Sequence, residues 1–268
     1  CNNVGLDTDS LTFNPEFLRE GTAVEDFFNP DRVVIGGNDS SKVQKLKDLY
    51  SNFEAEIIIT DPISSQLIKY LANTYLPLRL SFVNEAARLV NSSGGNLDDV
   101  LKGVGMDSRI GEHYFRPSPA WGGSCFPKDV VEVNNFYDSD EVNLPLIANI
   151  IESNKIQTQW TANMLKSIHN EKKLNGIILV GAAFKEDTDD LRNSPTIDIY
   201  NELLAENMNT MIYDDLIKSE EYLSIEDFEK LEGPHLIALM YPVKENLMSK
   251  INNIVSNTNS FLYTPWQL

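Results

Sequence analysis

The sequence predicts an α/β protein in which a long central helical segment precedes a C-terminal, doubly wound parallel sheet. In the last hundred residues or so, apolar runs of strand length alternate with helical patterns. Such alternation is typical of a parallel sheet that is covered by helices on both faces. A long helical pattern, from Ser64 to about Val90, comes before this region, and two short β-like runs, RVVIGG and EIIIT, stand near the start of the chain.

The expected elements follow in chain order. The opening part, to about residue 60, mixes loops with strands at 32–37 and 56–60. Asp61-Pro62 supplies start signals for the long helix, which Pro77 should kink because proline removes a backbone hydrogen bond. A short helix (97–105), an irregular loop (106–129) and a helix from about Pro145 to His169 come next. The C-terminal region predicts strands at 176–184, 208–215, 235–241 and 260–263, and helices at 194–207 and 244–257, the first capped by Ser194 with Pro195 at its first position.

Composition excludes several classes of protein. With 42% hydrophobic residues the 268-residue chain has the make-up of an ordinary globular protein, and no apolar run approaches the ~20 residues of a membrane span. A net charge of −18 argues against nucleic acid as a partner, because such binding depends on neutralising phosphates. Two cysteines, Cys1 and Cys125, form no disulfide framework and favour a cytoplasmic location, whereas three histidines without a Cys/His cluster argue against a metal site.

Cys125 lies in the stretch AWGGSCFPKDV, between a glycine pair and Pro127. Gly122 and Gly123 permit close approach of the backbone to a ligand, and Lys128 would favour the thiolate. Asp129 is near enough in sequence to orient a proton or a water molecule. The residues alone leave two interpretations open: a nucleophilic thiol, or a small buried side chain, which is the commoner fate of a cytosolic cysteine.

Three further groups of residues are each ambiguous alone. Lys69 and Asn73, at i and i+4 of the long helix, share one face and could polarise a hydroxyl, or could be solvated. Glu16 and Glu20, if one helical turn apart, could share a proton, or could mark an ordinary helix start. Lys185 and Arg192 flank a strand-to-helix loop that is either an anion-binding edge of the sheet or merely solvated.

Four stretches in this order resemble the UDP-glucose/GDP-mannose dehydrogenase family. They are NPEFLREGTAVEDFFNPDRVVIGG, KYLANTYLPLRLSFVNEAARL, GVGMDSRIGEHYFRPSPAWGGSCFPKDV and GAAFKEDTDDLRNSPTIDI. The resemblance is strong from about residue 12 to 200, and the cysteine segment is its most specific part. It implies a remnant of an N-terminal Rossmann-like NAD-binding domain (1–60), a central helical dimerisation domain with the cysteine loop (61–170) and a UDP-sugar-binding Rossmann-like domain (171–268).

The resemblance implies an NAD-dependent, four-electron oxidation of the C6 alcohol of a nucleotide sugar, UDP-glucose to UDP-glucuronate. Cys125 would capture the intermediate aldehyde as a thiohemiacetal, which is oxidised to a thioester and hydrolysed. In the family pattern Lys69 and Asn73 hold the oxyanion, while Asp129 and Glu16 manage protons and water. Substrate would be bound by Phe17, Leu18, Arg19, Glu20, Tyr114, Phe115, Arg116, Pro117, Ser118, Gly122, Lys185 and, from a neighbouring subunit, Arg109; Glu20, Lys128 and Arg192 would face NAD.

The chain also departs from the family pattern. No G-x-G-x-x-G follows any strand, so the chain alone is expected to bind a UDP-sugar weakly but to carry out no oxidation, even though it resembles an enzyme. Pro77 replaces a small residue, and the end FLYTPWQL lacks the arginine-containing finish seen in relatives. Two alternatives stay open: dehydrogenation of GDP-mannose or another nucleotide sugar, and a non-catalytic module that binds a nucleotide sugar. A homodimer or higher homo-oligomer is expected in either case.

Overall fold

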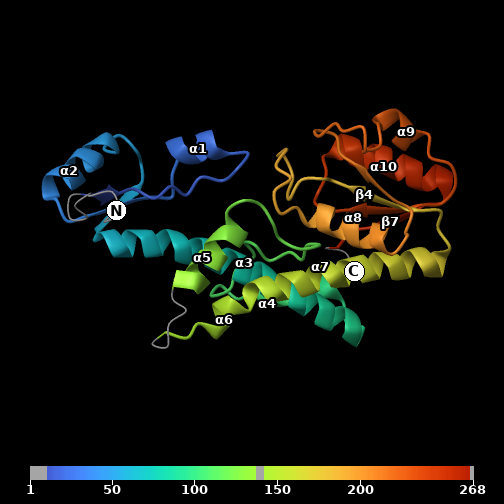
Figure 1. Ribbon diagram of the computed structural model, residues 1–268, viewed down its shortest axis with the longest axis horizontal. Coiled ribbons are helices and arrows are strands. Elements are labelled where there is room, and N and C mark those ends of the chain that lie inside the picture. Colours follow the sequence, from blue (N-terminus) through green and yellow to red (C-terminus); the bar gives the residue numbers. More distant parts are fainter. Residues whose placement is uncertain (1–10, 137–141, 266–268) are drawn as a thin grey trace. The chain divides into compact units, whose positions relative to one another are not determined.

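The computed structural model describes residues 11–136 and 142–265 (Figure 1). Its internal contacts divide the chain into an N-terminal unit that ends at Thr74 and a C-terminal unit that begins at Tyr75. Each unit is described by itself. Cys1 lies outside the described residues. Within those residues, no helix has the length and apolar character needed to cross a bilayer.

The N-terminal unit is built on a three-stranded sheet of order β1-β2-β3. The strands are β1 (Thr12–Phe13), β2 (Arg32–Gly37) and β3 (Glu56–Thr60). β2 and β3 pair in parallel, with Val34 opposite Ile58, which confirms both strands expected from the sequence. The core lies between this sheet and α2 (Ser40–Leu49), through Val33, Ile35 and Val43.

The sequence patterns missed β1, α1 (Ala23–Phe28) and α2. α2 is a mostly polar helix that buries only Val43 fully, so it has too few apolar positions to show a periodic pattern. Its start is instead marked by Asp39, whose carboxylate accepts hydrogen bonds from the backbone N–H groups of Ser41 and Lys42.

The long helix α3 (Pro62–Ser93) confirms the central helical pattern. Asp61 caps it by accepting from the N–H groups of Ile63 and Ser64, each at 2.9 Å. Gly36 allows the start of α3 to approach β2, because a Cβ at this position would lie 2.0 Å from Ser65 Oγ. The helix runs through Pro77 and is followed by α4 (Leu97–Gly105), as expected.

Two expectations for the central region were wrong. The irregular loop expected over 106–129 ends early, because α5 (Phe126–Phe136) begins directly after Cys125. Pro127 lies in its first turn, where the missing N–H costs no helical hydrogen bond. The helix expected from Pro145 is divided at Asn149 into α6 (Pro145–Ala148) and α7 (Ile150–Lys172).

The C-terminal unit contains a four-stranded, fully parallel sheet of order β5-β4-β6-β7. Its strands are β4 (Ile177–Val180), β5 (Thr210–Tyr213), β6 (Leu236–Leu239) and β7 (Phe261–Tyr263). The sequence predicted all four strands, each with longer bounds than the structure shows. The connecting helices are α8 (Pro195–Ala205), α9 (Ile225–Glu229) and α10 (Glu245–Thr258), of which α9 was not expected.

Helices cover both faces of this sheet (Figure 1). On one face Ile177 and Leu179 pack with residues of α7 and α8, including Leu165 and Ile199. On the other face Ile178 and Val180 pack with α9 and α10. The alternation of side chains along β4 between two buried faces confirms the doubly wound α/β architecture. The carboxyl ends of the strands therefore meet at one edge of the sheet, which is where such folds bind ligands.

Candidate active site

Cys125 stands at the junction of a loop and a helix. The segment 118–124 leads into it, and α5 begins at the next residue. Its side chain is exposed, with Ser124 Oγ 3.7 Å from Sγ, and its carbonyl oxygen accepts the hydrogen bond from Asp129 N–H at 2.9 Å. The thiol is therefore accessible at the positive end of a helix dipole, which favours negative charge. The interpretation as a buried filler residue does not fit this exposure.

The first turn of α5 also carries Lys128 and Asp129. Asp129 is 3% exposed, and its Oδ1 accepts a hydrogen bond from the Lys128 ammonium group. The Lys128 side chain is largely exposed. The start of α5 thus brings together a thiol, a buried carboxylate and a cation, within a segment that the sequence predicted to be a loop.

The glycine pair before Cys125 packs against the loop between β4 and α8. A Cβ on Gly122 would lie 2.0 Å from the Asn193 carbonyl oxygen, and one on Gly123, where φ is +89°, would meet the Phe184 ring. Asn193 Nδ2 donates to the Gly123 carbonyl oxygen at 3.1 Å. The close backbone approach expected of these glycines is therefore an approach to this loop.

The predicted sugar-pocket segment 114–118 alternates between exposed and buried side chains. Tyr114 (φ 53°) and Arg116 are exposed, whereas Phe115 and Pro117 are buried. The Arg79 guanidinium lies 5.2 Å from the centre of the Phe115 ring and donates to the carbonyl oxygens of Ile110 and Gly111.

Arg109, the residue expected to reach a neighbouring subunit, is highly exposed and forms an ion pair with Asp107 at 2.6 Å. The hydrogen bond to Asp107 raises the pKa of Arg109 and lowers that of the aspartate. Arg109 therefore lies at the surface of its own unit.

Lys185 and Arg192 lie in the loop between β4 and α8. The Lys185 ammonium group is 5.6 Å from the centre of the Phe184 ring, and Arg192 donates to both carboxylate oxygens of Asp190. The base of this loop is held by Asp214, at the end of β5, which accepts hydrogen bonds from Ala182 N–H at 2.7 Å and Tyr241 Oη–H at 3.0 Å. Burial, followed by the nearby Asp214 charge, raises the pKa of Tyr241, so the phenol stays a donor.

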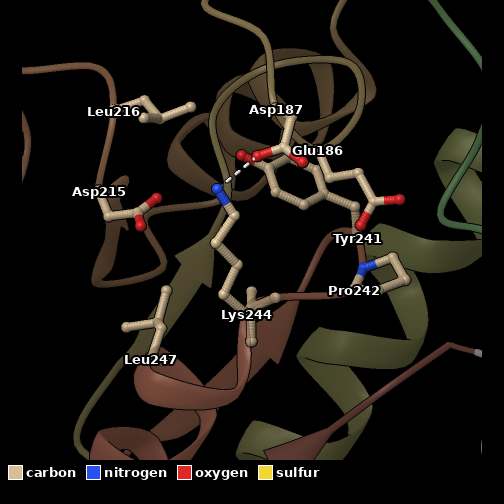
Figure 2. A pocket seen from close by; sticks show the side chains of 9 residues that line it. Glu186, Asp187, Asp215, Leu216, Tyr241, Pro242, Lys244 and Leu247 are labelled. Carbon is tan, nitrogen blue, oxygen red and sulfur yellow. Dashed lines mark ion pairs between the residues drawn. The ribbon is translucent and has the colours of Figure 1, made fainter. Parts of the chain in front are cut away.

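A pocket opens beside this loop, at the carboxyl ends of β4, β5 and β6 (Figure 2). Lys244 reaches across it to Asp187, with Nζ 2.7 Å from the carboxylate, and Asp215 stands on the opposite side. Sequence reasoning missed Asp214, Tyr241 and Lys244. The signal available for the first was an acidic residue at the carboxyl end of the strand predicted over 208–215.

The N-terminal unit brings three predicted residues together. Lys69 Nζ lies 2.9 Å from Glu16 Oε1 and 5.5 Å from the centre of the Phe17 ring. The Arg32 guanidinium also lies over that ring, 3.8 Å from its centre, and the sequence did not single it out. Asn73, one turn after Lys69 on α3, is buried, at 8% exposure.

The segment 14–19 is not helical, so the expectation of Glu16 and Glu20 on one helical turn was wrong. Glu16 instead accepts a hydrogen bond from the N–H of Leu18 at 2.7 Å, within a segment that has no regular structure. Arg19 pairs with Asp26 and lowers the pKa of this carboxyl group to about 2, so the pair persists throughout the neutral range. Leu18 itself is exposed.

No three His, Cys, Asp or Glu side chains form a metal-ion cluster in the part of the chain that the structure describes.

Comparison with known proteins finds one family over most of the chain. Models of the UDP-glucose/GDP-mannose dehydrogenase family match in three parts: the NAD binding domain at residues 3–54, the central domain at 63–156 and the UDP binding domain at 178–259. A protein of Rickettsia felis named UDP-glucose 6-dehydrogenase is 39% identical over 86% of this chain and 51% of its own length. A protein named UDP-glucose 6-dehydrogenase 1 from Arabidopsis thaliana is 35% identical over 94% of the chain and 54% of its own length.

Solved structures agree in fold. A UDP-glucose dehydrogenase from the hyperthermophilic archaeon Pyrobaculum islandicum is similar with a TM-score of 0.76 and 31% identity, over 86% of this chain and 55% of that one. A UDP-D-ManNAc dehydrogenase from Pyrococcus horikoshii has a TM-score of 0.78 at 22% identity, over 95% of this chain and 61% of its own, which is a likeness of fold. The chain spans about half the length of the first two curated relatives described above.

Proposed function

Because the chain belongs to the UDP-glucose/GDP-mannose dehydrogenase family, we propose that it is the sugar-side part of an oxidoreductase that converts the C6 alcohol of UDP-glucose to a carboxylate, with NAD as the hydride acceptor. The names of the relatives favour UDP-glucose over GDP-mannose. The observation that carries the proposal is the exposed thiol of Cys125 at the start of α5, with Lys128 and Asp129 in the same turn.

Cys125 acts at the stage of the C6 aldehyde. Its thiolate adds to the carbonyl carbon, a C–S bond forms, and the carbonyl oxygen takes up a proton to give a thiohemiacetal. Once this adduct has reached the oxidation level of a thioester, a water molecule adds to the carbonyl carbon, the C–S bond breaks and the thiolate leaves the carboxylate product. Asp129, a buried carboxylate one turn from the thiol, takes the proton from this water.

Lys69 and Asn73 serve the oxyanion that develops on the same carbonyl oxygen. Their i, i+4 spacing on α3 aims an ammonium group and an amide in one direction, and both can donate hydrogen bonds. Glu16, hydrogen-bonded to Lys69 at 2.9 Å, is placed to exchange a proton with it.

The nucleotide and sugar are assigned to the loops that carry the remaining predicted residues. Lys185, in the family's UDP binding domain at the carboxyl edge of the parallel sheet, meets the diphosphate. The 114–118 segment, Gly122 and the Phe17–Glu20 segment line the sugar and uridine. Arg109 reaches the substrate of a neighbouring subunit.

The described residues of the N-terminal unit do not fit the pyrophosphate of NAD. In dinucleotide-binding folds this group sits on a helix N-terminus after a glycine-rich turn. Here the N-termini of α2 and α3 are capped by Asp39 and Asp61. The hydrogen bond from the Ser41 side chain is the largest of several effects that lower the pKa of Asp39, and the one from Ser64 is the largest for Asp61. Both capping carboxylates therefore carry a negative charge, which repels a phosphate. Glu20, Lys128 and Arg192 would therefore make only outer contacts with NAD.

Calorimetry on the 268-residue chain tests the proposal. UDP-glucose and UDP should each give a saturable heat, whereas NAD should give none, because three outer contacts cannot offset the cost of immobilising a dinucleotide. Absorbance at the NADH band should stay flat in the presence of both ligands. GDP-mannose at the same concentration is the control for base and sugar. Steady NADH formation, or heat from GDP-mannose equal to that from UDP-glucose, would contradict the proposal.

We also propose that two copies associate through α3. In the C-terminal unit this helix exposes Tyr75, Phe82 and Leu89, which are seven residues apart and so lie on one face. Phe82 alone is 60% exposed. Sedimentation at micromolar concentration should give a dimer, and Phe82→Glu should shift it to the monomer. Asn91→Glu, an equal charge change on the opposite face of the helix, should leave the dimer intact; a monomeric wild-type chain would refute the assignment.

A further inference from the structure

The backbone of Trp121, four residues before Cys125, is held by a single side chain. Asn154 on α7 donates from Nδ2 to the Trp121 carbonyl oxygen at 2.8 Å and accepts from the Trp121 N–H at Oδ1, at 3.0 Å. One amide thus satisfies both polar groups of one residue, as a neighbouring β-strand would. Nothing in the sequence pattern pointed to Asn154, because its partner is 33 residues away.

The Trp121 side chain continues this connection toward the thiol. The indole is 5% exposed, and its Nε1 donates to Ser81 Oγ on α3 at 2.9 Å. Its ring meets the Phe126 ring edge-on, with 6.5 Å between centroids, and packs in one apolar cluster with Val130. Phe126 and Val130 belong to α5, so Trp121 contacts the helix that begins directly after Cys125.

The short segment between Trp121 and Cys125 has little freedom. Gly122 and Gly123 are packed against Asn193 and Phe184, as described above. Three further hydrogen bonds fix the preceding residues: Ser118 N–H to Asn84 Oδ1, Gln157 Nε2 to the Ser118 carbonyl, and Thr161 Oγ1 to the Pro119 carbonyl. The position of the thiol is therefore set at both ends, by the clamped Trp121 and by α5.

We infer that Asn154 is a positioning residue for the Cys125 thiol, acting through Trp121. The inference rests on the proposed function, in which Cys125 attacks the sugar C6. The geometry that Asn154 maintains keeps Sγ at the N-terminal end of α5, directly before the turn that carries Lys128 and Asp129. Asn154 does not touch the substrate.

The variant Asn154→Asp tests this inference with almost no change in shape. It loses the Nδ2 donor and sets a carboxylate oxygen against the Trp121 carbonyl. Gln159→Glu is the matched control: an amide-to-acid change on the same helix, at an exposed position. Both are made with Cys1→Ser, so that Cys125 is the reporter thiol.

The first readout is the rate of Cys125 alkylation by iodoacetamide at pH 7 in the 268-residue chain. It should fall about threefold in Asn154→Asp and be unchanged in Gln159→Glu, because only the first releases the thiol from the helix end. A purely structural role would lower the melting temperature and leave the alkylation rate of the folded protein unchanged, and that result, or faster alkylation, would overturn the inference. If Asn154→Asp fails to fold, Ser81→Ala, which removes only the indole hydrogen bond, should slow alkylation in the same direction.

The second readout separates this inference from the proposed function. In the protein as its cell makes it, with NAD and UDP-glucose, Asn154→Asp should lower kcat about tenfold with KM changed less than twofold, since the residue serves the thiol and not binding. If Cys125→Ala retains turnover, the proposed function fails whatever the alkylation rates show. If Cys125→Ala is inactive but Asn154→Asp matches Gln159→Glu in both readouts, only the positioning role fails.

Discussion

Replacing Cys125 with alanine should reduce uronate formation from UDP-glucose by about 10³-fold or more, the scale of loss when a covalent nucleophile is removed. The reason is chemical: without the thiolate, the C6 aldehyde has no partner with which to form a thioester. UDP-glucuronate is measured by chromatography and NADH by absorbance, in the protein as its cell makes it. Cys125→Ser should also give no turnover and should accumulate a sugar ester on the serine, visible as added mass on the peptide.

The matched control is Cys1→Ser, which removes the chain's other thiol from a position outside the described residues. Its turnover should equal that of the wild type. Normal acid production by Cys125→Ala would show that another group forms the covalent adduct, or that none is formed.

The second large effect is expected at Lys69 and Asn73. Lys69→Met and Asn73→Leu should each lower kcat about 10²-fold while KM changes little, because a donor to an oxyanion contributes mainly in the transition state. The buried position of Asn73 and the hydrogen bond from Lys69 to Glu16 support roles inside a site rather than in solvent. Steady-state kinetics with UDP-glucose at saturating NAD provide both constants.

Lys45→Met, on the exposed side of α2, removes the same charge elsewhere in the N-terminal unit and should leave kcat unchanged. A raised KM with intact kcat in Lys69→Met or Asn73→Leu would make these residues binding groups. Equal losses in Lys45→Met would mean that net charge, not position, is responsible.

The sheet of the C-terminal unit could be predicted from sequence because its information is local. The central strands β4 and β6 are short apolar runs that are buried on both faces, and Ser194-Pro195 marks the start of α8 directly. α5 could not be predicted in the same way. Its first residues, Phe126-Pro127-Lys128, follow a Gly- and Ser-rich stretch, and a proline in the first helical turn looks identical to a proline in a loop.

In the candidate site, too, the residues that are adjacent in sequence could be predicted and the distant ones could not. Cys125, Lys128 and Asp129 adjoin in sequence, so one motif was enough to find them. Asn154 and Asn193, which bind the backbone of the loop before Cys125, are distant from it in sequence. Nothing in the sequence distinguishes these two asparagines from the others. The Glu16–Glu20 expectation failed for a related reason: the Glu16 side chain accepts a hydrogen bond from Leu18 N–H in a non-helical segment, and no periodic pattern records such a bond.

The distant anchors of the Cys125 loop have a consequence for biosynthesis. Ser81 and Asn84 are translated before the loop, but Asn154 follows Trp121 by 33 residues, and Asn193 follows Gly123 by 70. A chain emerging from the ribosome therefore exposes a thiol with only part of its scaffold, and the loop cannot adopt its final geometry until the segment after β4 has been made. During that interval Cys125 is a thiol on a segment whose final geometry is not yet fixed, and it is open to oxidation or adduct formation before its scaffold is complete.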